Sequence, residues 1–452
     1  MNKIGFISAN NFKEPYPVYP IGVSYLLTYL EKNMPDCSCS LFDFNFDGGY
    51  DELKEWCKKG AFDVIAISLR NIDDNNILSE NCFVNHYEKI VKTLRLVTNV
   101  KIIVGGAGFS IFPELILDRL KVDFGIKGEG EESLCQLISA IVNNDDWHDI
   151  EGLVYRDDNG SIVVNKRNTF VKSPCLRMNP DTVQYYYDKS GMLNVQTKRG
   201  CPFNCIYCSY PIIDGKKVRT LDSSTVVDNI REMNEKFGID YLFFTDSVFN
   251  IDREYNEELC NKIIESGIKI HWGAYFSPRN LTKEDLVLYQ KSGLTHIEWG
   301  TDTLADKTLE TYCKRITWEQ IKETSQWASD LGVFYAHFMI LGGYGETNET
   351  LQQTFDRSRE LGFTVFFPYI GMRIYPNTAL YDIALKEGVI SSANELVEPK
   401  YYVSKNVNLE NVKEMAYATG QKWVFPGDGN EALIERFRAK KRRGPLWEYL
   451  RY

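Results

Sequence analysis

The sequence has no run of about 18 apolar residues, so we expect no transmembrane helix. It also lacks an excess of basic residues, because 52 Lys and Arg stand against 62 Asp and Glu, for a net charge of −10. Nonspecific nucleic-acid binding rests on neutralising phosphates with basic side chains. This charge balance therefore argues against a nucleic-acid partner. The opening residues Met1 to Ser8 predict a first strand, not a targeting segment.

Eleven cysteines could indicate disulfide bonds, but no secretory signal accompanies them. In a long chain of this kind, cysteines are more commonly reduced thiols. We therefore expect a cytoplasmic protein with no stable membrane insertion. With 452 residues, of which 44% are apolar, the chain has enough material for two or three domains.

The order of strand-like and helix-like segments predicts an α/β protein. Residues 3–145 alternate the two kinds, which indicates a Rossmann-like domain with a doubly wound parallel sheet. Residues 193–380 repeat the alternation and predict a partial (β/α)6 barrel. The motif Asp158-Asn159-Gly160 predicts a hairpin in the linker between them. We expect domains at 1–148, 149–190 (linker), 191–385 (barrel) and 386–452 (helical cap).

Three cysteines, Cys201, Cys205 and Cys208, follow the spacing C-x3-C-x2-C directly after the first predicted barrel strand. Thiolates are soft ligands that favour iron–sulfur clusters or zinc. A closed zinc site or an ordinary cluster needs a fourth ligand, and the next cysteine along the chain is Cys260. Three ligands leave one metal position open to a cosubstrate. A zinc knuckle or a chance group of reduced thiols is the alternative.

This cysteine spacing resembles the signature of the radical S-adenosylmethionine (SAM) superfamily. The resemblance implies that Cys201, Cys205 and Cys208 hold a [4Fe–4S] cluster whose fourth iron binds the amino and carboxylate groups of SAM. It implies reductive cleavage of SAM to a 5′-deoxyadenosyl radical. It also implies that Tyr207, the aromatic residue between the second and third cysteines, lies near the adenine.

The same resemblance implies SAM-binding residues at the ends of the later barrel strands. The residues expected there are Asp246, Ser277, Arg279, Glu298, Gly342 and Gly343. Asp246 would lie near the methionine amino group, and Arg279 could pair with a carboxylate through two hydrogen bonds. Glu298 would meet the ribose or the amine. Carboxylates at strand ends also cap helices, which is an equal alternative for Asp246 and Asp302.

Three loops of the N-terminal domain are similar to the cobalamin-binding half of B12-dependent radical SAM enzymes. They are Ser68-Leu69-Arg70, Gly105-Gly106 and Gly128-Glu129-Gly130. Glycines let the backbone approach a bulky flat ring, and the Ser68 hydroxyl can bond to a buried nucleotide tail. The alternative is a degenerate Rossmann-like domain that binds no cobalamin.

The sequence departs from many cobalamin enzymes in one respect. In D-x-H-x-x-G after the first strand, the histidine binds cobalt, but Ser8 to Lys13 contains no histidine. His148 lies in a similar motif that is one residue too long and misplaced, so we expect it at the surface. Cobalamin would then lack a histidine ligand. Arg70 is expected near the lower face of cobalt, where a cation would favour four-coordinate Co(I).

The resemblance implies a cobalamin-dependent radical SAM enzyme and favours a methyltransferase. The adenosyl radical would remove hydrogen from an unactivated carbon, and methylcobalamin would donate the methyl group. The alternatives are a non-methylating reaction (cyclisation, rearrangement or aminocarboxypropyl transfer) and a cobalamin-binding protein without catalysis. The expected partners are a small-molecule substrate and an electron donor such as flavodoxin or ferredoxin.

Overall fold

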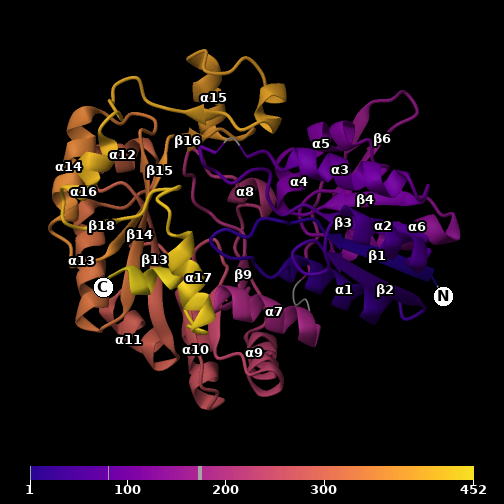
Figure 1. Ribbon diagram of the computed structural model, residues 1–452, viewed down its shortest axis with the longest axis horizontal. Coiled ribbons are helices and arrows are strands. Elements are labelled where there is room, and N and C mark those ends of the chain that lie inside the picture. Colours follow the sequence, from indigo (N-terminus) through magenta and orange to yellow (C-terminus); the bar gives the residue numbers. More distant parts are fainter. Residues whose placement is uncertain (1, 80, 172–175, 452) are drawn as a thin grey trace.

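The computed structural model describes residues 2–79, 81–171 and 176–451. Figure 1 shows two halves side by side, each built on a β-sheet with helices outside it. The N-terminal half runs from indigo to purple, and the second half runs from magenta to yellow. The predicted α/β architecture, with a Rossmann-like half followed by a partial barrel, is confirmed.

The N-terminal half contains a seven-stranded sheet in the order β2-β1-β3-β4-β5-β6-β7. The strands are β1 (Asn2–Ser8), β2 (Cys37–Asp43), β3 (Val64–Ser68), β4 (Lys101–Gly105), β5 (Phe124–Ile126), β6 (Leu153–Arg156) and β7 (Ile162–Val164). The first five are parallel, while β6 and β7 are antiparallel additions at one edge. The predicted hairpin is confirmed, and it extends this sheet. Residues 172–175 of the predicted linker lie outside the described residues.

Helices cover both faces of this sheet. They are α1 (Ile21–Asn33), α2 (Tyr50–Gly60), α3 (Val84–Arg95), α4 (Ala107–Ile111), α5 (Pro113–Leu120) and α6 (Glu131–Asn143). Alternate residues of β3 pack on opposite sides, so Ile65 and Ile67 join one core and Val64 and Ala66 another. Strands buried on both faces read as continuous apolar runs, which is why they were recognisable from sequence.

The second half contains a seven-stranded sheet in the order β18-β15-β14-β13-β12-β11-β8. The strands are β8 (Leu193–Val195), β11 (Tyr241–Phe244), β12 (His271–Phe276), β13 (Leu294–Asp302), β14 (Phe334–Leu341), β15 (Val365–Ile370) and β18 (Lys422–Trp423). Every pair is parallel, and β8 and β18 form the two edges. The sheet is therefore an open barrel of six strands, extended by β18 from the C-terminal region.

Helices surround the barrel sheet and continue into the C-terminal region. The longer ones are α7 (Pro180–Ser190), α9 (Ser223–Phe237), α10 (Arg253–Glu265), α11 (Lys283–Lys291), α13 (Trp318–Asp330) and α14 (Asn348–Ser358). The shorter ones are α8 (Tyr210–Ile213), α12 (Asp306–Thr311), α15 (Ala379–Lys386), α16 (Val412–Tyr417), α17 (Glu431–Ala439) and the 3-10 helices η1 (Phe249–Ile251), η2 (Ala393–Val397) and η3 (Leu446–Arg451). Two short ribbons, β9 (Lys198–Arg199) with β10 (Arg219–Thr220) and β16 (Met372–Arg373) with β17 (Tyr401–Tyr402), complete the fold. The C-terminal region thus mixes helices with strands.

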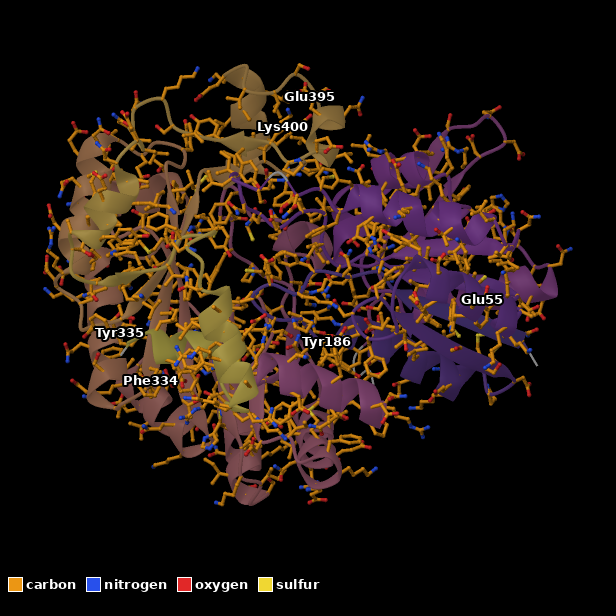
Figure 2. All side chains as sticks on the ribbon, viewed as in Figure 1. Glu55, Tyr186, Phe334, Tyr335, Glu395 and Lys400 are labelled. Carbon is orange, nitrogen blue, oxygen red and sulfur yellow. The ribbon has the colours of Figure 1, made fainter. Side chains whose placement is uncertain are left out.

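Buried polar contacts join the two halves. Tyr186 of α7 lies near their junction (Figure 2) and donates hydrogen bonds to both carboxylate oxygens of Asp43, at 3.0 and 2.9 Å. Arg373 of β16 meets Asp73 of the N-terminal half, with 2.7 Å between Nε and Oδ2 and both side chains 1% exposed. The same guanidinium donates to the carbonyls of Ile374 and Leu396. These contacts fix the position of one sheet against the other.

In the described residues, the helices are all too short or too polar to cross a lipid bilayer. This finding agrees with the expectation from hydropathy.

We predict that Arg373→Met lowers the free energy of unfolding by about 3 kcal/mol, because it leaves the Asp73 carboxylate buried without its partner. Urea denaturation followed by tryptophan fluorescence measures the change. Lys322→Met is the control, because it removes the exposed pair with Glu360 and should cost less than about 1 kcal/mol. Equal costs for the two variants would contradict the role of Arg373.

Candidate active site

A cavity of about 580 Å³ lies between the two halves, at the carboxyl ends of both sets of strands. Parallel α/β sheets bind ligands at these ends. Its walls come from the N-terminal loops on one side and from strands β8 and β11 on the other. The lining residues that matter here are Ser68, Arg70, Gly105, Gly106, Gly128, Glu129, Gly130, Asn194, Gln196, Arg199, Tyr210 and Thr245. The structure therefore brings most of the N-terminal site residues together at the barrel mouth.

Glycine shapes the N-terminal wall of the cavity. Gly106 has a φ of +95°, and a Cβ there would lie 2.6 Å from the carbonyl oxygen of Leu69. Leu69 itself is buried in the core, so it supports the wall without lining the cavity. Its N–H donates to the Gly105 carbonyl at 2.8 Å, and its own carbonyl accepts from Gly108 at 2.9 Å. The close backbone packing leaves room for a large ligand.

Arg70 is a cation that faces the cavity. Its side chain is exposed within this hollow, and none of the described carboxylates forms an ion pair with it. Although the side chain still contacts solvent in the hollow, the surrounding protein atoms partly desolvate the guanidinium, which lowers the pKa of Arg70; Tyr275 and Tyr210 are among its neighbours. No histidine is found among the described residues that line the cavity. His148 lies at the surface, where it pairs with Asp146.

Glu129 was expected to contact the cofactor, but the structure commits it to two arginines. It forms an ion pair with Arg199 at 3.2 Å and accepts a hydrogen bond from Arg219. Arg199 also meets Glu131 at 2.7 Å, and these carboxylates are 4% exposed. This buried network joins the loop after β5 to β9, whose last residue is two positions before Cys201.

The three cysteines lie in one loop at the barrel mouth. The N–H of Cys201 donates to the Gly215 carbonyl at 3.1 Å, and that of Cys208 donates to the Cys205 carbonyl at 3.2 Å. Burial, followed by the neighbouring Cys205 thiol, raises the pKa of Cys208 to about 12. In the described chain, no three His, Cys, Asp or Glu side chains are grouped as a ready site for a single metal ion. Cys201 is buried, whereas Cys205 and Cys208 are half-buried.

Tyr207, the aromatic residue within the cysteine motif, is tied to the barrel by its hydroxyl. The hydroxyl donates a hydrogen bond to Asp302, and the Lys314 ammonium lies 2.8 Å from the same carboxylate. Asp302 has a φ of +67°, which is unusual for a residue other than glycine. It is thus not a helix cap, as one alternative held, but an anchor for the cysteine loop. Lys314 gave no sequence signal, because no motif surrounds it.

Asp246, expected near the SAM amino group, forms several contacts within the protein. Its carboxylate accepts hydrogen bonds from the N–H groups of Thr197 and Lys198 at 2.8 and 2.9 Å, and also from the Thr197 hydroxyl. The Lys198 ammonium lies 3.1 Å away, with both side chains at most 2% exposed. Asp246 therefore fastens the end of β11 to the segment before the cysteines and has no free oxygen for a ligand.

Ser277 and Arg279 lie beyond the carboxyl end of β12, close to the cysteine loop. The Arg279 guanidinium lies over the ring of Phe203, 5.5 Å from its centroid. The Arg279 N–H donates to the Ser277 hydroxyl at 3.2 Å, and Asn250 donates to the Ser277 carbonyl at 2.8 Å. This arrangement leaves the guanidinium at the mouth of the barrel, beside the loop that carries the cysteines.

Gly342 and Gly343 form the turn after β14. Gly342 has a φ of +82°, and its N–H donates to the buried Glu346 carboxylate. A Cβ on Gly343 would collide with the hydroxyl of Tyr312. The turn therefore requires glycine at both positions for close packing.

Glu298 lies deeper than the other expected SAM residues. It is paired with Tyr275 and Ala336 in the sheet, four residues before β13 ends at Asp302. At ~3.3 Å per residue, this places it about 13 Å below the carboxyl end of its strand. The indole N–H of Trp447 donates to its carboxylate at 3.1 Å. The C-terminal region thus reaches the barrel interior, which sequence analysis missed.

Comparisons with known proteins agree with this geometry. The B12 binding domain matches residues 8–138, and the Radical SAM superfamily matches residues 195–357. An uncharacterized methyltransferase of Pyrococcus horikoshii is 26% identical over 319 residues, which cover 68% of this chain and 67% of that protein. An anaerobic magnesium-protoporphyrin IX monomethyl ester cyclase of Rubrivivax gelatinosus is 25% identical over 60% of this chain and 52% of that protein. The chain therefore spans about half the length of the cyclase.

A solved structure has the same fold. The radical SAM methyltransferase TsrM from Kitasatospora setae, solved with tryptophan and a SAM analogue, superposes with a TM-score of 0.90. The alignment covers 100% of this chain and 97% of that one, at 20% identity. The two domains and the cysteine loop define an enzyme of the radical SAM class. The chain thus combines a B12 binding domain with a domain of the Radical SAM superfamily, the two domains of cobalamin-binding radical SAM enzymes.

The glycine wall generates a prediction. Gly106→Ala should weaken cobalamin binding by about tenfold or more, because the new methyl group forces the Leu69 carbonyl towards the cavity and strains the backbone. Titration with hydroxocobalamin, followed by visible absorbance, measures the affinity. Gly160→Ala is the matched control, since its φ is +82° but no atom lies within 4 Å of the added methyl group. An equal loss of cobalamin affinity in both variants would show that backbone strain, and not the contact with Leu69, causes the effect.

Proposed function

We propose that this protein transfers a methyl group to a carbon atom of a small molecule. When bound, SAM, the [4Fe–4S] cluster and cobalamin supply radical chemistry and a methyl carrier. The observation that carries the proposal is the cavity that joins the glycine loops of the B12 domain to the barrel mouth. A methyl carrier and a substrate can meet only in such a shared space.

The cluster would be held by Cys201, Cys205 and Cys208. Their loop is anchored through Tyr207 to Asp302, and it follows directly after the buried Arg199 network. These anchors limit the freedom of the three cysteines that would hold the cluster. An electron donor such as flavodoxin or ferredoxin would reduce the cluster, which suits a cytoplasmic protein.

SAM would lie across the mouth of the barrel. The Arg279 guanidinium is free to pair with a carboxylate through two hydrogen bonds, and Ser277 offers a hydroxyl beside it. The glycine turn at Gly342 and Gly343 supplies a flat backbone surface. Tyr207 would contribute its ring, because its hydroxyl is already bonded to Asp302.

Cobalamin would occupy the N-terminal side of the cavity. Gly105, Gly106, Gly128 and Gly130 provide a wall without side chains, and Ser68 provides a hydroxyl. Arg70 would approach the lower face of cobalt, where its positive charge discourages a lower ligand.

Other functions are rivals to methyl transfer. Similarity to the Rubrivivax cyclase favours a non-methylating reaction such as ring formation on the same scaffold. Aminocarboxypropyl transfer and a cobalamin-binding protein without catalysis are further alternatives. The mass of the product separates all of these reactions from methylation.

The test uses enzyme reconstituted anaerobically with iron, sulfide and cobalamin, with SAM that carries a deuterated methyl group. Tryptophan, the ligand of the Kitasatospora protein, is the first candidate substrate, followed by an extract of small molecules. We expect S-adenosylhomocysteine and a product with a deuterated methyl group. Cys205→Ala should lose the cluster absorbance and product formation. A product formed without a methyl group would refute methyl transfer, and an active Cys205→Ala enzyme would refute the role of the cluster.

Arg70 provides a separate prediction about cobalt. Electron paramagnetic resonance of the Co(II) form should show no nitrogen splitting in the unmodified protein, because Arg70 does not coordinate. Arg70→His should introduce that splitting, since imidazole nitrogen is a good ligand for transition metals. Arg70→Lys keeps the charge and should resemble the unmodified protein. Nitrogen splitting in the unmodified protein would refute this role for Arg70.

A further inference from the structure

Partly exposed side chains face the interior of the barrel below the cysteine loop. Inward-facing residues of the strands and of the segments just beyond them retain partial exposure, whereas the residues between them are buried under helices. The partly exposed inward residues are Asn194, Gln196, Thr245, Tyr275, Gly300, Phe338, Ile340, Phe367 and Tyr369. Three of these, Asn194, Gln196 and Thr245, also line the cavity between the halves. The region that these residues border, called here the inner chamber, therefore adjoins that cavity.

Aromatic rings form a continuous band around the inner chamber. The ring of Phe243 lies 5.1 Å from that of Tyr275, centroid to centroid, and Tyr275 lies 6.1 Å from Phe338. Phe338 stacks on Phe367 at 5.2 Å. The band thus consists of rings from β11, β12, β14 and β15, and β13 contributes no ring to it. The faces of such rings attract cations as well as apolar groups.

Glu298 lies on β13, the strand that contributes no ring to the aromatic band. It is an inward-facing carboxylate, whereas Asp302 at the end of the same strand is bonded to Tyr207 and paired with Lys314. It is paired in register with Tyr275 on one side and with Ala336 on the other. Ala336 contributes only a methyl group, which is buried in a cluster with Val365 and Trp447. Tyr16 and Tyr369 are further neighbours of its charge.

The floor of the chamber supports one half of the Glu298 carboxylate. Trp447 of η3 packs edge-on against His296, with ring centroids 5.8 Å apart, and its N–H bonds to Oε1 of Glu298. Within the described chain, Oε2 accepts no hydrogen bond and is not among the fully buried, unpartnered oxygens. One oxygen is thus fixed from below while the other faces the chamber. Burial raises the pKa of Glu298 to about 7, so a bound cation would favour its ionised form.

We propose that Glu298 binds a positively charged nitrogen of the substrate, within the aromatic band of the inner chamber. This inference rests on the proposed function, because it names the substrate class of that site as an amine with a flat or apolar body. A lone carboxylate among aromatic rings suits an ammonium group, which gains an ion pair on one side and ring faces on the others. Glu298 is then a specificity-determining residue and not a SAM ligand.

The position of Glu298 argues against the SAM role that its sequence context implied. Glu298 lies level with Ala336, six residues before the Gly342 turn, and level with Tyr275, two residues before Ser277. A molecule held by the cluster loop at the mouth would have to reach past the aromatic band to meet it. A substrate that lies beneath SAM meets it directly.

The test compares two probes of the same shape on the anaerobic holoenzyme. Phenethylammonium carries the positive nitrogen, and 2-phenylethanol replaces it with a neutral hydroxyl. Ligand-observed NMR gives both dissociation constants. We expect the ammonium to bind at least tenfold more tightly than the alcohol, and Glu298→Gln to abolish this preference while leaving the affinity for the alcohol unchanged. A tenfold change corresponds to about 1.4 kcal/mol.

Glu346→Gln is the matched control, because Glu346 is also a buried carboxyl group with a pKa raised to about 7 but lies in the turn after β14. It should keep the preference for the ammonium. Cluster and cobalamin spectra confirm that each variant is loaded. The two probes can also be compared on the unmodified protein alone. The inference therefore stays testable even if a variant misfolds.

Three outcomes would overturn the inference. They are equal affinities for the two probes, an unchanged preference in Glu298→Gln, and a Glu298→Gln variant whose cluster signal no longer responds to SAM while amine binding persists. The last outcome would show that Glu298 contributes to SAM binding and not to amine binding. A holoenzyme that prefers the ammonium but transfers no methyl group to any amine would instead contradict the proposed function and leave this inference standing.

Discussion

The site depends on buried ion pairs that hold two independent sheets in one relative position. The cavity exists only while the carboxyl ends of both sheets face each other. Arg199 links the loop after β5 to the segment before the cysteines, and Arg373 links Asp73 to the ribbon beyond β15. Charges with such low exposure tolerate few alternative partners. The cofactor loops and the cluster loop are therefore parts of one rigid unit.

Sequence alone predicted the architecture well, for a physical reason. Strands buried on both faces are continuous apolar runs, and the glycine-rich loops follow them at the edge where ligands bind. The cysteine spacing is local, so the loop with Cys201, Cys205 and Cys208 was recognisable without any knowledge of the fold. Most of the N-terminal site residues, including Arg70, line the observed cavity.

Sequence analysis missed contacts between residues that lie far apart in the sequence. Asp246 and Glu129 were expected to meet ligands, and in the structure they also pair with Lys198 and Arg199. The depth of Glu298 follows from the length of β13, which a motif does not reveal. Trp447 could not be connected to the barrel, because its contact with Glu298 spans 149 positions. Local patterns identify loops, whereas long-range contacts decide which side chains are free.

The position of Trp447 limits the routes by which a ligand can reach the interior of the barrel. Its indole closes the bottom of the barrel, with Phe334 and Val365 packed in the same cluster. Anything that reaches Glu298 must then descend from the cleft, past the positions where the large cofactors would sit. In this arrangement, substrate and product would pass through the same opening, at which the cofactors would also bind. The shape of the barrel would thereby set the order in which substrate and cofactors bind and leave.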